Sequence, residues 1–313
     1  MNIEERNSLY ANKYFSFILY AFKGVSQVLL IDNVITGILI IVGIMLFSPL
    51  LGLIAFVSSL LGTVLAYDLN GDINDLSIGL FGFNPTLTGM ATMFLVNSPY
   101  SWIYALVAAS ASSILFLILD RSFKKKNIPV LTVPFILITW FMQLAGVHLG
   151  IFHVNPEFIV ETRTVFTFAP DNLPNFLLVL IKGTSEVFLI DSVWTGLLIL
   201  VALFLAGWKY GVNAIIGTFV ALLTAYFFGV DTVTIELGLF NFNAILSIIS
   251  VGLTFDHKER SIAITGIIAA MGSVIFTAGI NLLVFPLGLS ALTFPFIGVT
   301  WIFLWIRNSF LKD

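Results

Sequence analysis

Residues 22–37 read FKGVSQVLLIDNVITG, and residues 181–196 read IKGTSEVFLIDSVWTG. Ten of these 16 positions are identical at an offset of 159 residues, so one segment occurs twice in the chain. One of the six differences changes the formal charge, because the residue is an amide in the first copy (Gln27) and a carboxylate in the second (Glu186). A carboxyl group in apolar surroundings is costly and usually faces a bundle interior or a water-filled path. The pair therefore predicts a duplicated membrane fold with one polar pore position in each half.

The composition predicts an integral membrane protein. Of the 313 residues, 59% are hydrophobic and 10% are charged, and the mean hydropathy is +1.05. A soluble domain carries about 25% charged residues. The absence of cysteine excludes disulfides and thiolate chemistry. The N-terminal stretch lacks the pattern of a cleaved signal peptide, so we expect the first helix to be retained. We expect contact with lipid and no nucleic-acid partner, because the basic run Arg121–Lys126 is typical of a cytoplasmic anchor.

Two further blocks recur in the same order. Gly79–Ala91 matches Gly238–Ser250 at six of 13 positions, and Leu131–Trp140 matches Leu292–Trp301 at seven of 10. Internal repeats of this kind identify a chain made of similar units. We therefore predict a first repeat over residues 1–150, an extracytoplasmic linker over 151–173 and a second repeat over 174–313.

The distribution of basic residues predicts that the halves are inverted. The loop 121–126 is strongly basic, whereas its counterpart 281–289 has no charge. One span earlier the relation is reversed, because 97–101 is uncharged and its counterpart carries Lys258 and Arg260. Cytoplasmic loops collect lysine and arginine, so equivalent loops lie on opposite sides of the membrane. Inversion requires an odd number of spans in each half.

Five spans in each half place both termini in the cytoplasm of a cell whose plasma (inner) membrane holds the protein. This count leaves Lys209 and Arg163 outside, against the trend. The segments 76–95 and 235–252 are apolar but punctuated by Gly and Asn, and we predict two re-entrant pore half-helices there. The fold class is then all-α, with ten spans in two inverted five-helix repeats: 14–31, 33–48, 50–67, 101–119, 128–146, 174–190, 192–207, 211–228, 260–279 and 289–306.

Glu186 has a structural interpretation and a functional one. Lys182 lies one helical turn away, and the two could form an ion pair. However, both copies keep the lysine, whereas the first copy has Gln27 in place of the carboxylate. An ion pair that the fold required would be present in both copies, so this argues against the structural interpretation. We favour a pore-facing role for Gln27 and Glu186. For Asp32 and Asp191, each of which precedes a new apolar run, we predict helix N-caps.

Thr132 and Thr293 each precede a proline by two residues in the doubled LTxPF block. Their hydroxyls can bond to their own backbone, or both can face the pore across a pseudo-two-fold axis, and the sequence leaves these alternatives open. Phe83, Phe242, Leu87 and Leu246 recur at the same offset in the second doubled block. A pore with these groups offers mostly hydrogen-bond acceptors and phenyl faces, which suits a flat neutral solute rich in N–H groups.

No metal site or cofactor is expected. His148, His153 and His257 are scattered near or outside the expected membrane edges. No Ser/His/Asp set or pair of carboxylates at a common depth suggests an enzyme. Ammonium channels use paired histidines at mid-membrane, and aquaporins carry two Asn-Pro-Ala-like boxes, and this chain has neither pattern. A transporter coupled to protons or sodium ions through Glu186 remains the alternative.

The doubled LTVPF and LTFPF motifs, the doubled pore segment and the two five-span halves resemble the urea transporter (urea channel) family of bacterial type. The resemblance covers nearly the whole chain. It implies a homotrimer with one pore per subunit, which conducts urea or a related small amide without coupling ions. It also implies that Gln27 and Glu186 bind the N–H groups of urea at the two ends of the filter. The slots and the centre would be formed by Phe83, Phe242, Val28, Val187, Leu87, Leu246, Thr132 and Thr293.

One departure from this pattern is visible in the doubled pore segment. The first copy reads NPTLTG after Phe83, whereas the second reads NAILSI, so the proline that follows Asn84 has no counterpart after Asn243. We therefore expect a different backbone geometry in the second half near Asn243.

Overall fold

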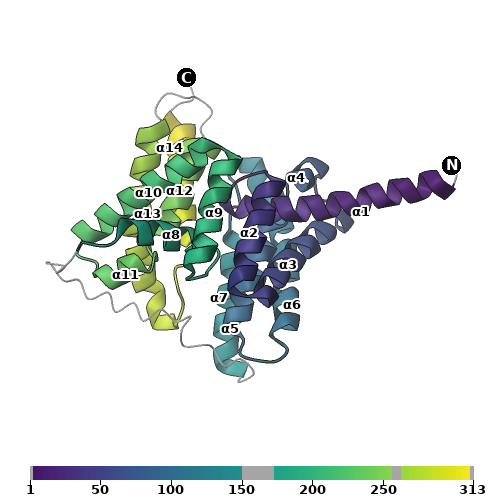
Figure 1. The fold of residues 1–313 in the computed structure, drawn as a ribbon, viewed down its shortest axis with the longest axis horizontal. Helices are drawn as coiled ribbons and strands as arrows, with labels where there is room; N and C mark the ends of the chain where they lie inside the picture. Colours follow the sequence, from purple (N-terminus) through teal and green to yellow (C-terminus); the bar gives the residue numbers. More distant parts are fainter. Residues whose placement is uncertain (1–2, 150–172, 256–261, 311–313) are drawn as a thin grey trace.

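The structure is a computed structural model that describes residues 3–149, 173–255 and 262–310, and these residues form a bundle of helices (Figure 1). The all-helical architecture with several strongly apolar helices confirms the prediction of an all-α membrane protein. The helices are α1 (Ile3–Ser26), α2 (Val34–Phe47), α3 (Pro49–Asp68), α4 (Ile73–Ser77), α5 (Phe83–Leu95), α6 (Ser101–Phe123), α7 (Val133–Leu149), α8 (Phe176–Glu186), α9 (Val193–Ala206), α10 (Trp208–Phe227), α11 (Thr232–Glu236), α12 (Asn241–Ile249), α13 (Ile262–Val284) and α14 (Phe294–Phe310), with short 3-10 turns η1 (Gln27–Leu29), η2 (Lys124–Lys126) and η5 (Phe285–Leu287) and a π-helical turn η4 (Ser250–Thr254).

The two halves of the chain lie side by side, and α2 and α9 pack against each other between them (Figure 1). The contacts of these two helices are reciprocal. The Thr36 hydroxyl lies 3.5 Å from the carbonyl oxygen of Ala202. In turn the Thr195 hydroxyl donates to the carbonyl oxygen of Gly43 at 2.8 Å. Exchange of equivalent contacts is the pattern that a two-fold axis generates.

Four helices in the described residues are long and apolar enough to cross a membrane. Others are shorter, such as 193–206 and 294–307, and a helix of 14 residues is only about 21 Å long. Such helices reach across about 30 Å of hydrocarbon only with the help of flanking residues or a locally thinner bilayer. The four long segments are Pro49–Asp68, Ser101–Lys126, Trp208–Phe227 and Ile264–Leu287.

The first two predicted spans, 14–31 and 33–48, do not form an antiparallel hairpin. Tyr14–Leu29 and Val34–Phe47 meet at a bend of 78°, so α1 runs almost perpendicular to α2 and extends away from the bundle (Figure 1). The cause is the turn between them, in which Leu30 takes a left-handed conformation (φ 60°). The two predicted spans therefore do not run side by side along their length but meet at a sharp bend, where α1 packs closely on α2: a Cβ atom on Gly37 would lie 1.9 Å from the carbonyl oxygen of Phe22.

The prediction that 76–95 returns to the side where it started is also wrong. The Arg121 guanidinium donates to the carbonyl oxygen of Leu69 at 3.2 Å, and Lys124 is ion-paired with Asp75. The C-terminal ends of α3 and α6 therefore lie at the same end of the bundle, and these two long helices run parallel. The chain between them must travel the length of the bundle, so α4 and α5 together form a broken crossing. In the second half, α12 packs on α10 and α13 as α5 packs on α3 and α6.

Candidate functional site

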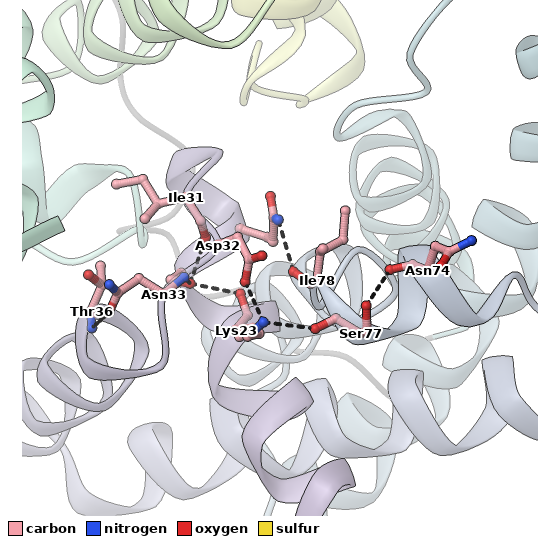
Figure 2. Close-up of polar contacts among 10 residues, drawn as sticks. Lys23, Ile31, Asp32, Asn33, Thr36, Asn74, Ser77 and Ile78 are labelled. Carbon is pink, nitrogen blue, oxygen red and sulfur yellow. Dashed lines mark hydrogen bonds and ion pairs between the residues drawn. The ribbon is translucent and has the colours of Figure 1, made fainter. Parts of the chain in front are cut away.

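The amide-bearing end of the site lies where η1 follows α1. Gln27 is buried and donates from Nε2 to the carbonyl oxygen of Ile78 at 2.9 Å, while the Lys23 ammonium binds the carbonyl oxygen of Ser77 at 3.0 Å (Figure 2). The same ammonium forms an ion pair with Asp32 at 2.8 Å. The segment between α4 and α5 is thus fixed to the end of α1 by two side chains. The amide oxygen of Gln27 is left as an acceptor.

The carboxylate-bearing end lies at the last residue of α8. Glu186 is partly exposed, and in the described part of the chain its carboxylate has neither a hydrogen-bond donor nor an ion-pair partner. Lys182 binds Asp191 instead, with 2.9 Å between Nζ and Oδ1. The structural interpretation of Glu186 as the partner of Lys182 is therefore wrong. This end presents a carboxylate that is available to a solute.

The predicted N-caps at Asp32 and Asp191 are wrong. The residue that follows each of them caps the helix: Asn33 caps α2 and Ser192 caps α9. Each cap accepts the N–H three residues later, at 3.0 and 3.3 Å. The aspartates instead form ion pairs with the lysine of the preceding helix, at 2.8 Å for Lys23–Asp32 and 2.9 Å for Lys182–Asp191. The doubled segment therefore encodes a lysine–aspartate brace in each half.

The two halves meet at the doubled LTxPF blocks. Thr132 Oγ1 and Thr293 Oγ1 lie 2.7 Å apart, and both side chains are buried. Of the alternatives for these hydroxyls, the structure favours contact across the pseudo-two-fold axis over a bond to their own backbone. The hydroxyl pair forms the centre of the candidate site.

Two tryptophans hold the blocks together on either side of this pair. Trp140 Nε1 donates to the carbonyl oxygen of Ser290 at 2.9 Å. Trp301 Nε1 donates to the carbonyl oxygen of Pro129, also at 2.9 Å. The exchange is reciprocal, and it fixes the relative position of the two loops that carry the threonines.

A buried asparagine holds the first of these loops. Asn84, near the start of α5, donates from Nδ2 to the carbonyl oxygen of Leu131 at 3.0 Å and accepts the N–H of Phe135 at 3.0 Å. Leu131 has a left-handed backbone (φ 54°), a conformation that costs free energy for a residue with a side chain. The two hydrogen bonds of Asn84 stabilise that turn and the start of α7. We call this arrangement the asparagine clamp.

The second half contains the same clamp. Asn243 donates from Nδ2 to the carbonyl oxygen of Leu292 at 3.0 Å and accepts the N–H of Phe296 at 3.3 Å. The expectation of a different geometry here, based on Ala244 in place of the first copy's proline, is therefore wrong for the clamp. The proline is not needed because the hydrogen bonds run from side chain to backbone.

The sequence reasoning named neither asparagine and neither tryptophan as a functional residue. A signal was present, since Asn84 and Asn243 recur in the doubled pore segment and Trp140 and Trp301 in the LTxPF block. Recurrence alone did not separate them from residues kept for packing. Their role depends on partners about 50 to 170 positions away, as in Asn84 to Phe135 (51) and Trp301 to Pro129 (172).

Loss of one clamp is expected to destabilise the protein. In Asn84→Ala, the carbonyl oxygen of Leu131 and the N–H of Phe135 remain buried without partners, at a cost of about 1–3 kcal/mol each. We expect a clearly lower midpoint of thermal unfolding in detergent. Thr92→Val is the matched control on the same helix, because the hydroxyl of Thr92 bonds only to the carbonyl oxygen of Thr88, four residues back. Equal melting of the two variants would contradict the clamp.

The other predicted site residues occupy corresponding elements of the two halves. Phe83 begins α5 and packs edge-on against Phe116 of α6, with ring centroids 5.6 Å apart. Phe242 is the second residue of α12. Among the predicted site residues, Thr132 and Thr293 contact each other across the two halves. The remaining four are also buried: Val28 in η1, Val187 after α8, Leu87 in α5 and Leu246 in α12.

The site has no features of a metal centre. Among the residues that the structure describes, no three His, Asp or Glu side chains are grouped so that they could hold a metal ion. His153 and His257 lie outside the described residues. The groups that the site offers are one free carboxylate, one amide oxygen, a hydroxyl pair and apolar faces. These groups can bind and orient a small polar solute.

Comparison with known proteins identifies the family. A family model described as "Urea transporter" matches residues 18–308. "Urea transporter 1" of Ovis aries is 28% identical over 305 residues, which cover 94% of this chain and 78% of that protein. "Urea transporter 1" of Rattus norvegicus is 27% identical over 299 residues, with the same coverage. These descriptions concern transport proteins and exclude the enzyme class. Because the family match spans nearly the entire chain, the protein belongs to the urea transporter family.

Proposed function

We propose that the protein conducts urea passively across the membrane through a narrow pore between its two halves. The observation that carries this proposal is the family match over residues 18–308, which includes all ten predicted site residues. Gln27 and Glu186 bind the N–H groups of urea at the two ends of the pore. Phe83, Phe242 and the neighbouring valines form flat slots. The Thr132–Thr293 pair and two leucines narrow the centre.

The chemistry of the site supports a neutral solute with several N–H donors. Its polar groups are mostly acceptors, and a donor-rich amide can exchange its bonds to water for bonds to them. Conduction requires several sites of moderate affinity, so that the solute can also leave. Ions are disfavoured because they lose their hydration shell in a slot where Glu186 is the only formal charge among the predicted site residues.

The corrected set of spans supports inverted halves with cytoplasmic termini. With α1 and its counterpart α8 left out, and with the α4–α5 and α11–α12 crossings included, each half still has five crossings. Lys209, the second residue of α10, then lies on the same side as the basic segments 121–126 and 256–261. The ten-span count from sequence had left Lys209 on the opposite side. Agreement with the positive-inside rule improves, which favours this orientation in the plasma (inner) membrane.

The family resemblance also leads us to propose a homotrimer. Large apolar side chains are exposed along α13 and α6, for example Ile264, Ile268, Ile275 and Ile118. Such surfaces face lipid or a neighbouring subunit in a membrane protein. The mass of the detergent-solubilised particle, measured by light scattering with correction for bound detergent, distinguishes three copies from one.

Stopped-flow light scattering on proteoliposomes tests the function. We expect urea to equilibrate much faster than in protein-free liposomes, and ionophores that collapse proton and sodium gradients should leave the rate unchanged. A urea permeability equal to that of empty liposomes would sink the proposal. Collapse of uptake by the ionophores would instead favour the ion-coupled transporter.

A further inference from the structure

The two ends of the pore differ in which acceptors remain free. At the first end the amide nitrogen of Gln27 is bound to the Ile78 carbonyl group at 2.9 Å. At the second end the Glu186 carboxylate has no donor among the described residues. The residue of the second half that corresponds to Ile78 is Leu237. The Glu186 carboxylate cannot donate a hydrogen bond to the carbonyl oxygen of Leu237 as Gln27 does to that of Ile78. The second end therefore has the larger unmet capacity to accept hydrogen bonds.

A second side chain next to this end also lacks a partner. Asn241 is buried and donates from Nδ2 to the carbonyl oxygen of Val179 at 3.0 Å, but its Oδ1 atom has no hydrogen-bond donor in the described residues. This amide lies directly against α8, because a Cβ atom added to Gly183 would be 1.9 Å from its nitrogen. Gly183 and Glu186 are three residues apart and so share a face of the helix. The first half has Gly82 at the position of Asn241, with no side chain to accept a bond.

The fixed charges near the two ends also differ, and the Glu186 end is the more negative one. In the first half, Asp75 of α4 is neutralised by Lys124, and Lys125 and Lys126 follow it. The corresponding end of α13 carries no charge over 279–287. On α8, α11 and the turn into α9, the charged side chains are one lysine and four carboxylates: Lys182, Glu186, Asp191, Asp231 and Glu236.

We propose that the Glu186 end of the pore is a binding site for small planar cations of the guanidinium type, which block urea at that end. The proposal rests on the proposed function. Guanidinium shares the flat, three-armed shape of urea, but all its polar groups are donors, and it pairs with carboxylates through two parallel hydrogen bonds. Glu186 supplies the carboxylate, and the unpartnered Asn241 Oδ1 atom, which is buried against α8, adds a negative partial charge to the same end.

The bound cation stays at this end because the rest of the pore offers it no counter-charge. Beyond Glu186 the predicted site residues carry no charge: they are apolar groups, the Thr132–Thr293 hydroxyl pair and, at the far end, the amide of Gln27. Moving a charge into such surroundings without a partner is costly. Urea, which is neutral, does not meet this barrier, so a cation of the same shape acts as a plug.

The test measures how guanidinium chloride inhibits urea flux in proteoliposomes at constant ionic strength, with the neutral amide N-methylurea as the comparison. In the unmodified protein we expect inhibition at millimolar guanidinium. Glu186→Gln, which makes this end like its twin, should raise the inhibitory concentration about tenfold or more, because one interacting charge is lost. Asn241→Gly, which copies Gly82, should raise it by a smaller factor than Glu186→Gln, because the buried amide dipole acts on the cation through space and not by contact. The inhibitory concentration of N-methylurea should change less than that of guanidinium in both variants.

Equal inhibition of the unmodified protein and Glu186→Gln by guanidinium, or no inhibition of the unmodified protein, would overturn the inference. Calorimetric titration of guanidinium chloride into the purified full-length protein separates this inference from the proposed function. Binding that weakens in Glu186→Gln supports the site even if urea flux is absent. Rapid urea flux without guanidinium binding leaves the proposed function standing and removes this inference.

Discussion

Gly79→Ala is expected to prevent assembly of the first half of the pore. Gly79 has a left-handed backbone (φ 81°), and a Cβ atom there would lie 2.4 Å from the backbone nitrogen of Gly24 and 2.5 Å from the carbonyl carbon of Lys23. Backbone atoms cannot move aside as the end of a side chain can. The strained conformation and the clash together cost about 2–5 kcal/mol. Since Gly79 follows Ile78, the clash also pushes α1 away from the carbonyl group that Gln27 binds.

The measurement is the yield of monodisperse protein and its thermal midpoint in detergent. Gly279→Ala is the matched control, because a Cβ atom at Gly279 meets nothing within 4 Å and alanine favours the helix interior by up to about 1 kcal/mol. We expect this control to fold at least as well as the unmodified protein. If Gly79→Ala melts at the same temperature as Gly279→Ala, the close crossing of α1 and the segment before α5 is wrong.

The second large effect is expected at Glu186. Leucine at this position removes the Glu186 acceptor from the proposed pore, so an N–H group of urea that has left water finds no partner there. A buried donor left without a partner costs about 1–3 kcal/mol, so Glu186→Leu should slow urea flux by about 10- to 100-fold. Glu186→Gln keeps a carbonyl-type acceptor and copies Gln27, whose amide nitrogen bonds to the backbone. Its flux should therefore exceed that of Glu186→Leu.

Stopped-flow permeability per reconstituted molecule decides between the two variants. If Glu186→Gln and Glu186→Leu abolish flux equally while both proteins remain folded, the charge itself is required. The ion-coupled transporter would then regain support over the channel. A graded loss, with glutamine well above leucine, shows that acceptance of a hydrogen bond is the requirement.

The sequence singles out candidate site residues because the chain contains the segment twice. Gln27 and Glu186 were found by comparing copies, and Thr132 and Thr293 by their place in a doubled motif. The structure brings the threonines into contact at 2.7 Å. Repetition marks a position as constrained in both halves, but it does not say which atoms the side chain touches. For this reason Asp32 was assigned to a helix cap, although its partner is Lys23 of the preceding helix.

The sequence by itself determined that this is an apolar helical chain with one pattern written twice, because hydropathy and internal identity are properties of residues in order. Only the tertiary structure decided which segments cross the bundle. An apolar stretch reveals that it avoids water but not its direction, and direction follows from contacts between distant residues. The bond from Arg121 to Leu69 shows that the segment 76–95 belongs to a crossing, and the 78° bend after α1 shows that the first two expected spans do not run side by side.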